Sequence, residues 1–236
     1  MRQGKEYVLA RGEWHQQHWK IVEDIARPQR EVVERLGKLA SAQIADSMGR
    51  HGVVHYGIKP LCHDMRVAGP AVTVLTRPGD ALFVQKAIEI CREGDVVVID
   101  ASGYRDVAAL GERLAYYFQR KGISGIVCDG AIRDSQGIAG LGLAVFSRGV
   151  CIKIFGSEGP GAINVPVQCG GVVVNPGDVV IGDRDGVVVV PREDSPRIAE
   201  LAEKHLAGEL ERVRQIEDGQ SMEVVYGVDT KIGKWM

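Results

Sequence analysis

Short apolar runs alternate with predicted helices through the middle of the chain. Val67–Thr76, Asp95–Asp100 and Gly125–Asp129 are rich in Val and Ile, as expected for strands that are buried on both faces. Ala81–Arg92 and Ala108–Lys121 are predicted helices, each followed within two residues by a glycine that can end it. Because strand, helix and strand follow one another within about 30 residues, we expect a βαβ unit whose strands are parallel neighbours.

The regions on either side of this unit combine further helices with short strands. Pro28 can begin a helix at its first turn, and Ser41–Asp46 is predicted to form a second, short helix. Ala144–Phe146 and Val150–Phe155 are further strand candidates because they are dominated by apolar residues. A lysine, Lys153, lies within the second of these segments.

The C-terminal part of the sequence predicts an antiparallel meander followed by a long helix. Three strands are expected at Gly171–Val174, Asp178–Ile181 and Val187–Val190, separated by Asn-Pro-Gly and Asp-Arg-Asp-Gly turns. A charged helix is expected from Ser195, with Pro196 in its first turn, to about Glu217. The residues after it carry no assignment.

Composition excludes several classes of protein. The 236 residues are 45% hydrophobic and 25% charged, and the net charge is −2, so no basic excess attracts nucleic acid or an anionic membrane. No apolar run approaches the roughly 20 residues of a membrane span, and the polar N-terminus lacks the apolar core of a secretory signal. The five cysteines are scattered and form no CxxC motif, which favours reduced core residues in the cytoplasm.

The chemistry of the chain is expected where the strand Gly125–Asp129 ends. Arg133 and Asp134 follow it closely, and ligands of α/β proteins gather at the carboxyl ends of strands. A guanidinium can bind a carboxylate through two hydrogen bonds, and an adjacent carboxylate can hold a hard cation. Together these groups suit a small α-keto acid chelated to a divalent metal. A structural salt bridge or a helix cap explains the same two residues equally well.

A second candidate is the stretch Ala109–Leu114, which follows the strand ending at Asp100. If the two strands are neighbours, the backbone N–H groups of this stretch face the same crevice, and a helix N-terminus there would bind an anion. The alternative is that Gly111 is merely tolerated within a helix.

Four motifs in this order resemble one known family: Gly111-Glu112-Arg113-Leu114, Asp129-Gly130-x-x-Arg133-Asp134, Pro176-Gly177-Asp178 and Asp183-x-Asp185-Gly186. They resemble the 4-hydroxy-4-methyl-2-oxoglutarate / 4-carboxy-4-hydroxy-2-oxoadipate aldolases, a family that also contains the regulators of ribonuclease E activity A (RraA). The resemblance extends from about Leu36 to Pro191. It does not cover residues 1–27.

The resemblance implies a fold, an assembly and an activity. The fold is a three-layer β/β/α swivelling α/β fold with N- and C-terminal helices, so we expect an N-terminal extension (1–27) and a single domain (28–236). The assembly is a homotrimer or homohexamer. The activity is class II: a divalent-metal-dependent (Mg²⁺ or Mn²⁺) aldolase cleaves a 4-hydroxy-2-oxo di- or tricarboxylate into pyruvate and a second oxo acid, with oxaloacetate decarboxylation as a side activity.

The resemblance also implies roles for single residues. Asp134 would contact the metal, and Arg133 would bind the keto acid and steady the enolate. The backbone of a four-residue loop would hold the pyruvate carboxylate: Gly111, Glu112, Arg113 and Leu114. A neighbouring subunit would supply an acid from its C-terminal helix, for which Glu209 and Glu211 are candidates. Arg113 stands where the family usually has an apolar residue, which affects the expected substrate preference more than the chemistry.

Two other hypotheses remain at this point. An RraA-type regulator would bind and inhibit a ribonuclease without catalysis. A class I aldolase would form a Schiff base on a buried Lys153, although a lysine pointing to solvent from an edge strand is the stronger interpretation. The Arg133–Asp134 pair and the Gly111 loop favour the metal-dependent enzyme, because a docking protein has no need of them.

Overall fold

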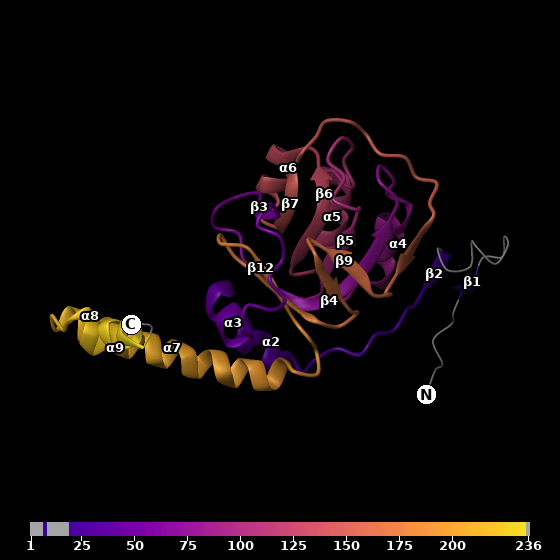
Figure 1. The fold of residues 1–236 in the computed structure, drawn as a ribbon. Coiled ribbons are helices and arrows are strands. Elements are labelled where there is room, and N and C mark those ends of the chain that lie inside the picture. Colours follow the sequence, from indigo (N-terminus) through magenta and orange to yellow (C-terminus); the bar gives the residue numbers. More distant parts are fainter. Residues whose placement is uncertain (1–6, 9–18, 235–236) are drawn as a thin grey trace.

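The computed structural model describes residues 7–8 and 19–234 (Figure 1). Its main sheet has the order β1-β2-β8-β4-β5-β6-β7-β3, and β11 and β12 are attached through β4. These strands are β1 (Tyr7–Val8), β2 (Trp19–Ile21), β3 (Lys59–Pro60), β4 (Val67–Thr76), β5 (Val96–Asp100), β6 (Gly125–Ile132), β7 (Ala144–Val150), β8 (Gly161–Ile163), β11 (Val179–Gly182) and β12 (Val187–Val190). A separate two-stranded sheet pairs β9 (Val167–Cys169) with β10 (Val172–Val174).

The helices are short except for one near the C-terminus. They are α2 (Arg30–Gly37), α3 (Ser41–Ser47), α4 (Leu82–Ile90), α5 (Glu112–Arg120), α6 (Ser135–Gly140), α7 (Ser195–Glu217), α8 (Met222–Tyr226) and α9 (Val228–Gly233). Within the described ranges, no helix is both long and apolar enough to cross a membrane.

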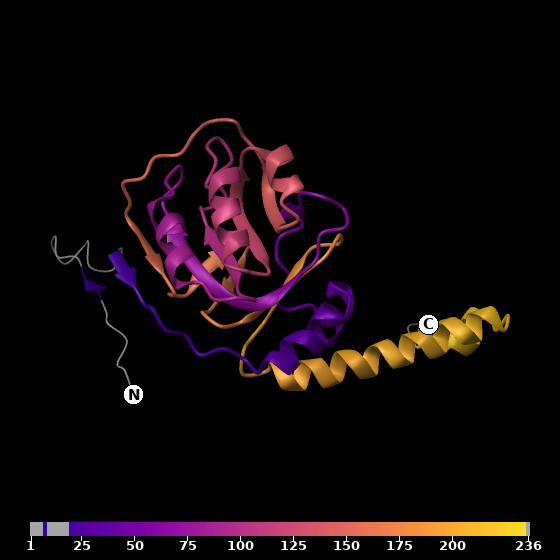
Figure 2. The same ribbon diagram turned by 180° about the vertical axis from the view of Figure 1, so that it is seen from behind.

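The fold has three layers, and the parallel strands β4 to β7 form the middle one. Val97 and Ile99 of β5 pack in one core with Phe118 of α5, whereas Val96 and Val98 pack in a second core with residues of β9 to β12. Alternate residues of one strand therefore serve two cores, which explains its continuous apolar sequence. Figure 2 shows α4, α5 and α6 together over one face of the sheet. The predicted β/β/α layering is confirmed, as is the parallel pairing of β5 with β6.

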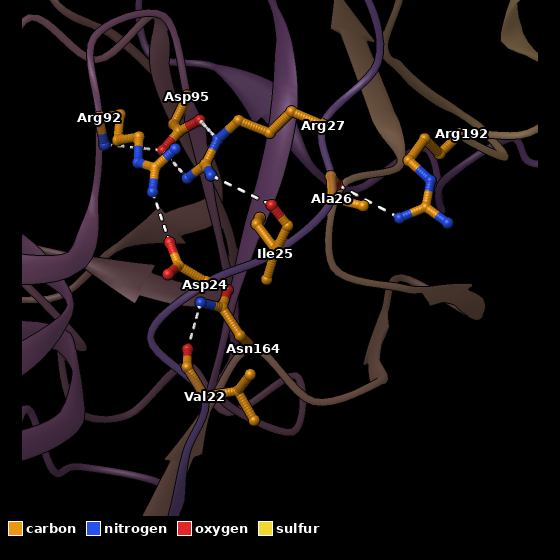
Figure 3. Close-up of polar contacts among 9 residues, drawn as sticks. All are labelled: Val22, Asp24, Ile25, Ala26, Arg27, Arg92, Asp95, Asn164 and Arg192. Carbon is orange, nitrogen blue, oxygen red and sulfur yellow. Dashed lines mark hydrogen bonds and ion pairs between the residues drawn. The ribbon is translucent and has the colours of Figure 1, made fainter. Parts of the chain in front are cut away.

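Residues 22–27, here called the strap, tie the N-terminal segment to the domain (Figure 3). Nε and Nη2 of Arg27 each donate to one oxygen of the buried Asp95 carboxylate, both at 2.8 Å. The amide of Asn164 donates to the Val22 carbonyl at 2.7 Å, and Asp24 forms an ion pair with Arg92. The last residues of the predicted extension thus pack on the sheet, while most of residues 1–18 lie outside the described part of the chain.

The helix expected from Ala108 begins only at Glu112. Residues 108–110 are not helical, because they contact the end of β6: the Ala109 N–H donates to the Ala131 carbonyl at 2.8 Å. β6 itself continues past Asp129 to Ile132, because Ala131 and Ile132 pair with Gly149 and Val150 of β7. The contact of residues 108–110 with the end of β6 brings Gly111 beside the residues that follow β6.

The expected strand Val150–Phe155 was wrong. β7 ends at Val150, and the segment after it leaves Ile152 and Ile154 93% and 62% exposed. Lys153 is exposed as well, so the burial that a Schiff-base lysine requires is absent. The predicted three-stranded meander was wrong too. Of its three strands, β11 and β12 pair with each other, whereas β10 pairs with β9 in a separate sheet.

The long helix α7 has the predicted bounds and is attached to the domain by its first part. Ile198, Ala199 and Ala202 are buried against α2, α3, β11 and β12. Its far end projects from the body in both ribbon views (Figures 1 and 2). Two short helices, α8 and α9, occupy the region after Glu217, for which no element was predicted.

Candidate active site

Arg133 and Asp134 follow directly after β6, at the carboxyl end of the parallel strands. The Arg133 N–H donates to the Leu110 carbonyl at 3.0 Å, which continues the pairing between residues 108–110 and β6. Asp134 has φ 59° and ψ 40°, a left-handed conformation that Asp adopts more readily than most residues. The chain turns there and enters α6. The turn leaves the Asp134 side chain 40% exposed and that of Arg133 24% exposed.

Gly111 allows this pair to lie against the start of α5. A Cβ atom at position 111 would lie 2.6 Å from Oδ2 of Asp134 and 3.0 Å from Cγ of Arg133. Both distances are shorter than ordinary van der Waals contacts. The backbone of Gly111 itself is extended, so the requirement for glycine here comes from the space taken by its neighbours.

Hydrogen bonds orient one carboxylate oxygen of Asp134 and leave the other free. Oδ2 accepts from Nε of Arg133 at 3.1 Å and from the Glu112 N–H at 3.3 Å. Over the described ranges, Oδ1 has no hydrogen-bond partner. The same holds for the N–H groups of Arg113 and Leu114 in the first turn of α5. The salt bridge considered from the sequence therefore exists, and it leaves an acceptor and two donors available.

These groups border a cleft of about 310 Å³. Its polar lining comes from α5 and from the turn after β6, and its apolar wall from the segment that follows β7. The lining residues are Gln85, Gly111, Arg113, Leu114, Tyr117, Arg133, Asp134, Ile154 and Phe155. Gln85, Ile154 and Phe155 were not predicted, since they approach the other residues only through the packing of α4 and of residues 151–155. Tyr117 was not predicted either, although it lies one turn after Arg113 on α5.

The free oxygen of Asp134 fits a hard divalent cation. Mg²⁺ is typically held by one or two carboxylates, with water and substrate oxygens completing its shell. One partly exposed carboxylate oxygen on a cleft of this size satisfies that requirement. The glutamate of the predicted loop, Glu112, lies elsewhere: its carboxyl group packs against Gly137 in α6.

Glu209 and Glu211 lie on α7. This helix lies on the opposite side of the molecule from α6 in Figure 1. Glu209 faces α3: its Oε2 accepts from the Gln43 amide at 2.9 Å, and its Oε1 is 3.4 Å from Nε2 of His205. Glu211 is exposed and pairs with Arg214 on the same helix. Within one protomer, neither glutamate lines the cleft.

His205 also approaches Asp46 of α3, with 3.7 Å between Nε2 and Oδ2. Asp46, His205 and Glu209 thereby form a group whose ligand atoms lie within 4.8 Å of one another, close enough to share a cation. His205 was not singled out from the sequence. Its spacing of four residues from Glu209 on a predicted helix is the signal that could have found it.

Comparison with known proteins places the chain among the RraA-like proteins. The family described as RraA-like, Aldolase/RraA, matches residues 41–189. A Halalkalibacterium halodurans protein provisionally named 4-hydroxy-4-methyl-2-oxoglutarate aldolase is 42% identical over 68% of this chain and 77% of its own length. A Thermus thermophilus 4-hydroxy-4-methyl-2-oxoglutarate aldolase is 32% identical over 55% of this chain and 79% of its own.

The solved structures give a consistent result. Streptomyces coelicolor RraAS2, described as an unusual member of the RNase ES inhibitor RraA protein family, superposes with a TM-score of 0.71. It is 34% identical, over 79% of this chain and 97% of its own. The matches therefore include proteins named as enzymes and proteins named for inhibition of a ribonuclease or of RNA processing.

Proposed function

Because the chain belongs to the RraA-like family, we propose that it is a divalent-metal-dependent aldolase that cleaves a 4-hydroxy-2-oxo acid into pyruvate and a second oxo acid. The observation that carries the proposal is the meeting of Arg133, Asp134 and the first turn of α5 at one cleft. A protein that acted only by docking would need neither a free carboxylate oxygen nor unsatisfied N–H groups at that place.

The pyruvate half of the substrate is held by α5 and Arg133. The N–H groups of Arg113 and Leu114 point out of the positive end of the helix, which suits the C1 carboxylate. The guanidinium of Arg133 supplies fixed positive charge beside the C2 oxygen, where negative charge develops when the C3–C4 bond breaks. Asp134 would hold Mg²⁺ or Mn²⁺ through Oδ1. The ion, when bound, would supply Lewis acidity toward the C2 oxygen of the substrate.

Cleavage also requires a base for the C4 hydroxyl proton and an acid that returns a proton to C3 of the enolate. We assign both proton transfers to Glu209 of a neighbouring subunit in a homotrimer or homohexamer. Of the two candidates, Glu209 has a carboxylate positioned by Gln43 and His205, whereas Glu211 is exposed on the helix. Loss of CO₂ from oxaloacetate gives the same enolate, so oxaloacetate decarboxylation is the expected side activity.

The second candidate function is that of an RraA-type regulator that binds and inhibits a ribonuclease. It is favoured by one observation, the superposition on Streptomyces coelicolor RraAS2. The two functions differ in their need for the cleft, because inhibition by docking would survive the loss of Asp134 and the addition of EDTA.

The test is replacement of Asp134 by Asn, with pyruvate release measured from 4-hydroxy-4-methyl-2-oxoglutarate and from oxaloacetate. Asn adopts the left-handed conformation as readily as Asp, so the fold should persist. Because the amide cannot replace the charge of the carboxylate, we expect turnover to fall by about 100-fold or more. Asp218→Asn, at the exposed end of α7, is the matched control.

Two results would contradict the proposal. One is full activity in Asp134→Asn, and the other is the absence of EDTA-sensitive pyruvate release from either compound by the unaltered protein. The second result would favour the docking function. The oligomeric state, the choice between Mg²⁺ and Mn²⁺, the cytoplasmic location and the division at residue 27 stay predictions.

A further inference from the structure

We propose that the side chain of Arg113 binds a second carboxylate, carried by the part of the substrate beyond C3, and thereby sets a preference for dicarboxylic over monocarboxylic substrates. The proposal rests on the proposed aldolase function for the identity of the substrate. It goes beyond the backbone role of the Gly111–Leu114 loop, because it concerns the guanidinium of Arg113.

The position of Arg113 on α5 places its side chain at the cleft. Gly111 precedes the helix, so Arg113 is its second residue, and Tyr117 lies one turn further along the same face. Both residues line the cleft with Arg133 and Asp134. The preceding residue, Glu112, points the other way, toward Gly137 of α6. The guanidinium of Arg113 therefore stands beside the place assigned to pyruvate.

Charge in the cleft points to a second anion. Three charged side chains line it, and Arg133 and Asp134 already form an ion pair. Arg113 is exposed, and no carboxylate within the described part of the chain pairs with it. Of the three charged side chains that line the cleft, Arg113 is therefore the one whose charge no described protein group neutralises. An arginine presents a planar fork of N–H donors that matches a carboxylate.

The cleft has room for this second group. At about 30 Å³ for each non-hydrogen atom, the share of a water molecule in the liquid, pyruvate with its six such atoms takes up roughly 180 Å³. The cleft measures about 310 Å³, so space remains beside the keto acid. Ile154 and Phe155 form the apolar wall, which suits the carbon chain between the two charged ends.

The experiment compares two ligands that differ in one carboxylate. The affinities of 2-oxoglutarate and 2-oxopentanoate, which have the same number of carbons, are measured by calorimetry in the presence of MgCl₂. Arg113→Leu should reduce the preference for 2-oxoglutarate by about 10- to 100-fold, the range of one charge-assisted hydrogen-bonded contact. Arg113→Lys should give an intermediate value, since the charge remains and the fork is lost.

The matched control is Arg120→Leu. Arg120 is exposed at the other end of the same helix and does not line the cleft, so its loss should leave both affinities unchanged. If Arg113→Leu weakens both ligands equally, or neither, the proposal is overturned. Equal weakening together with a changed oligomeric mass would assign Arg113 to a subunit contact instead.

Pyruvate release measured on the same proteins separates this inference from the function on which it rests. A protein that binds 2-oxoglutarate through Arg113 and releases no pyruvate would overturn the aldolase proposal and support the role of Arg113. A protein that releases pyruvate with the same substrate preference after Arg113→Leu would overturn only the role of Arg113.

Discussion

Replacing Gly111 by Ala tests whether the close approach of α5 to the Arg133–Asp134 pair matters for activity. The added Cβ would lie 2.6 Å from Oδ2 of Asp134. Since non-bonded heavy atoms need about 3.5 Å, the carboxylate must move by roughly 0.9 Å. The backbone at Gly111, with φ −138° and ψ −175°, is one that alanine adopts without strain. The substitution therefore acts on the position of two side chains and not on the backbone.

The expected loss of activity follows from that displacement. A misplacement of about 1 Å in a catalytic group can lower the rate by about 100-fold, so kcat for pyruvate release should fall by a factor of this size. Stability should change little, because the loss of unfolded-state entropy on replacing Gly by Ala favours folding by about 0.4–1 kcal/mol and offsets part of the steric cost.

The assay pairs pyruvate release with thermal unfolding, and Gly140→Ala is the control. Position 140 lies at the end of α6, close to the site in sequence, and a Cβ there would meet no atom within 4 Å. The control should keep its activity. A Gly111→Ala protein with unchanged kcat would refute the reasoning, because the two side chains could then move without consequence. A large drop in melting temperature would show that the effect is on folding.

Two further predictions concern stability. Burial opposes ionisation of Asp183, but hydrogen bonds from Ser41 and from the backbone outweigh it and hold the pKa of this carboxyl below its usual value. The contribution of the Asp183 carboxylate to folding stability is therefore present at neutral pH and lost as the pH falls below about 4. Asp183→Asn should lower the free energy of unfolding by about 1–3 kcal/mol at pH 7, measured by urea unfolding. A loss of stability that stayed constant down to pH 3 would contradict this. Arg27→Ala should cost about 3 kcal/mol because it leaves the buried Asp95 without its ion-pair partner and with only the Arg92 N–H as a donor. Arg30→Ala, which breaks an exposed pair, should cost under about 0.5 kcal/mol; equal costs would show that the Arg27–Asp95 pair adds no stability.

The sequence predicted those elements whose pattern is local. β4 has the expected bounds, Val67–Thr76, because an apolar run rich in Val lies between two turns. The helix from Ser195 to Glu217 was predicted from its cap residues and its charged face. In both cases the residues that decide the structure are neighbours along the chain.

One error arose where a distant partner decides the structure. Residues 108–110 are not helical because they hydrogen-bond to the end of β6, about twenty residues away, and helix propensity does not report that contact. The pairing of β10 with β9 was missed for another reason: it is a local hairpin closed by Gly170 and Gly171, and Val167–Cys169 was not predicted to be a strand. The apolar segment 151–155 has the pattern of a strand, but the side chains of residues 152–154 are exposed.

The candidate site was predicted only in part. Arg133, Asp134 and Gly111 were named from motifs, and the structure brings them together. The separate orientations of Glu112 and Arg113 were not predictable, because they depend on where α6 packs. The difference between Glu209 and Glu211 likewise depends on α3, whose residues Gln43 and Asp46 face only one side of α7.

At the left-handed turn of Asp134, folding stability and the proposed catalysis favour different residues. Backbone energetics there favour glycine, and a side chain held in this region costs on the order of 1 kcal/mol. The proposed chemistry instead requires a carboxylate at that spot. A chain selected only for resistance to unfolding would drift away from Asp at 134, so thermal selection without a screen for turnover would work against the active site.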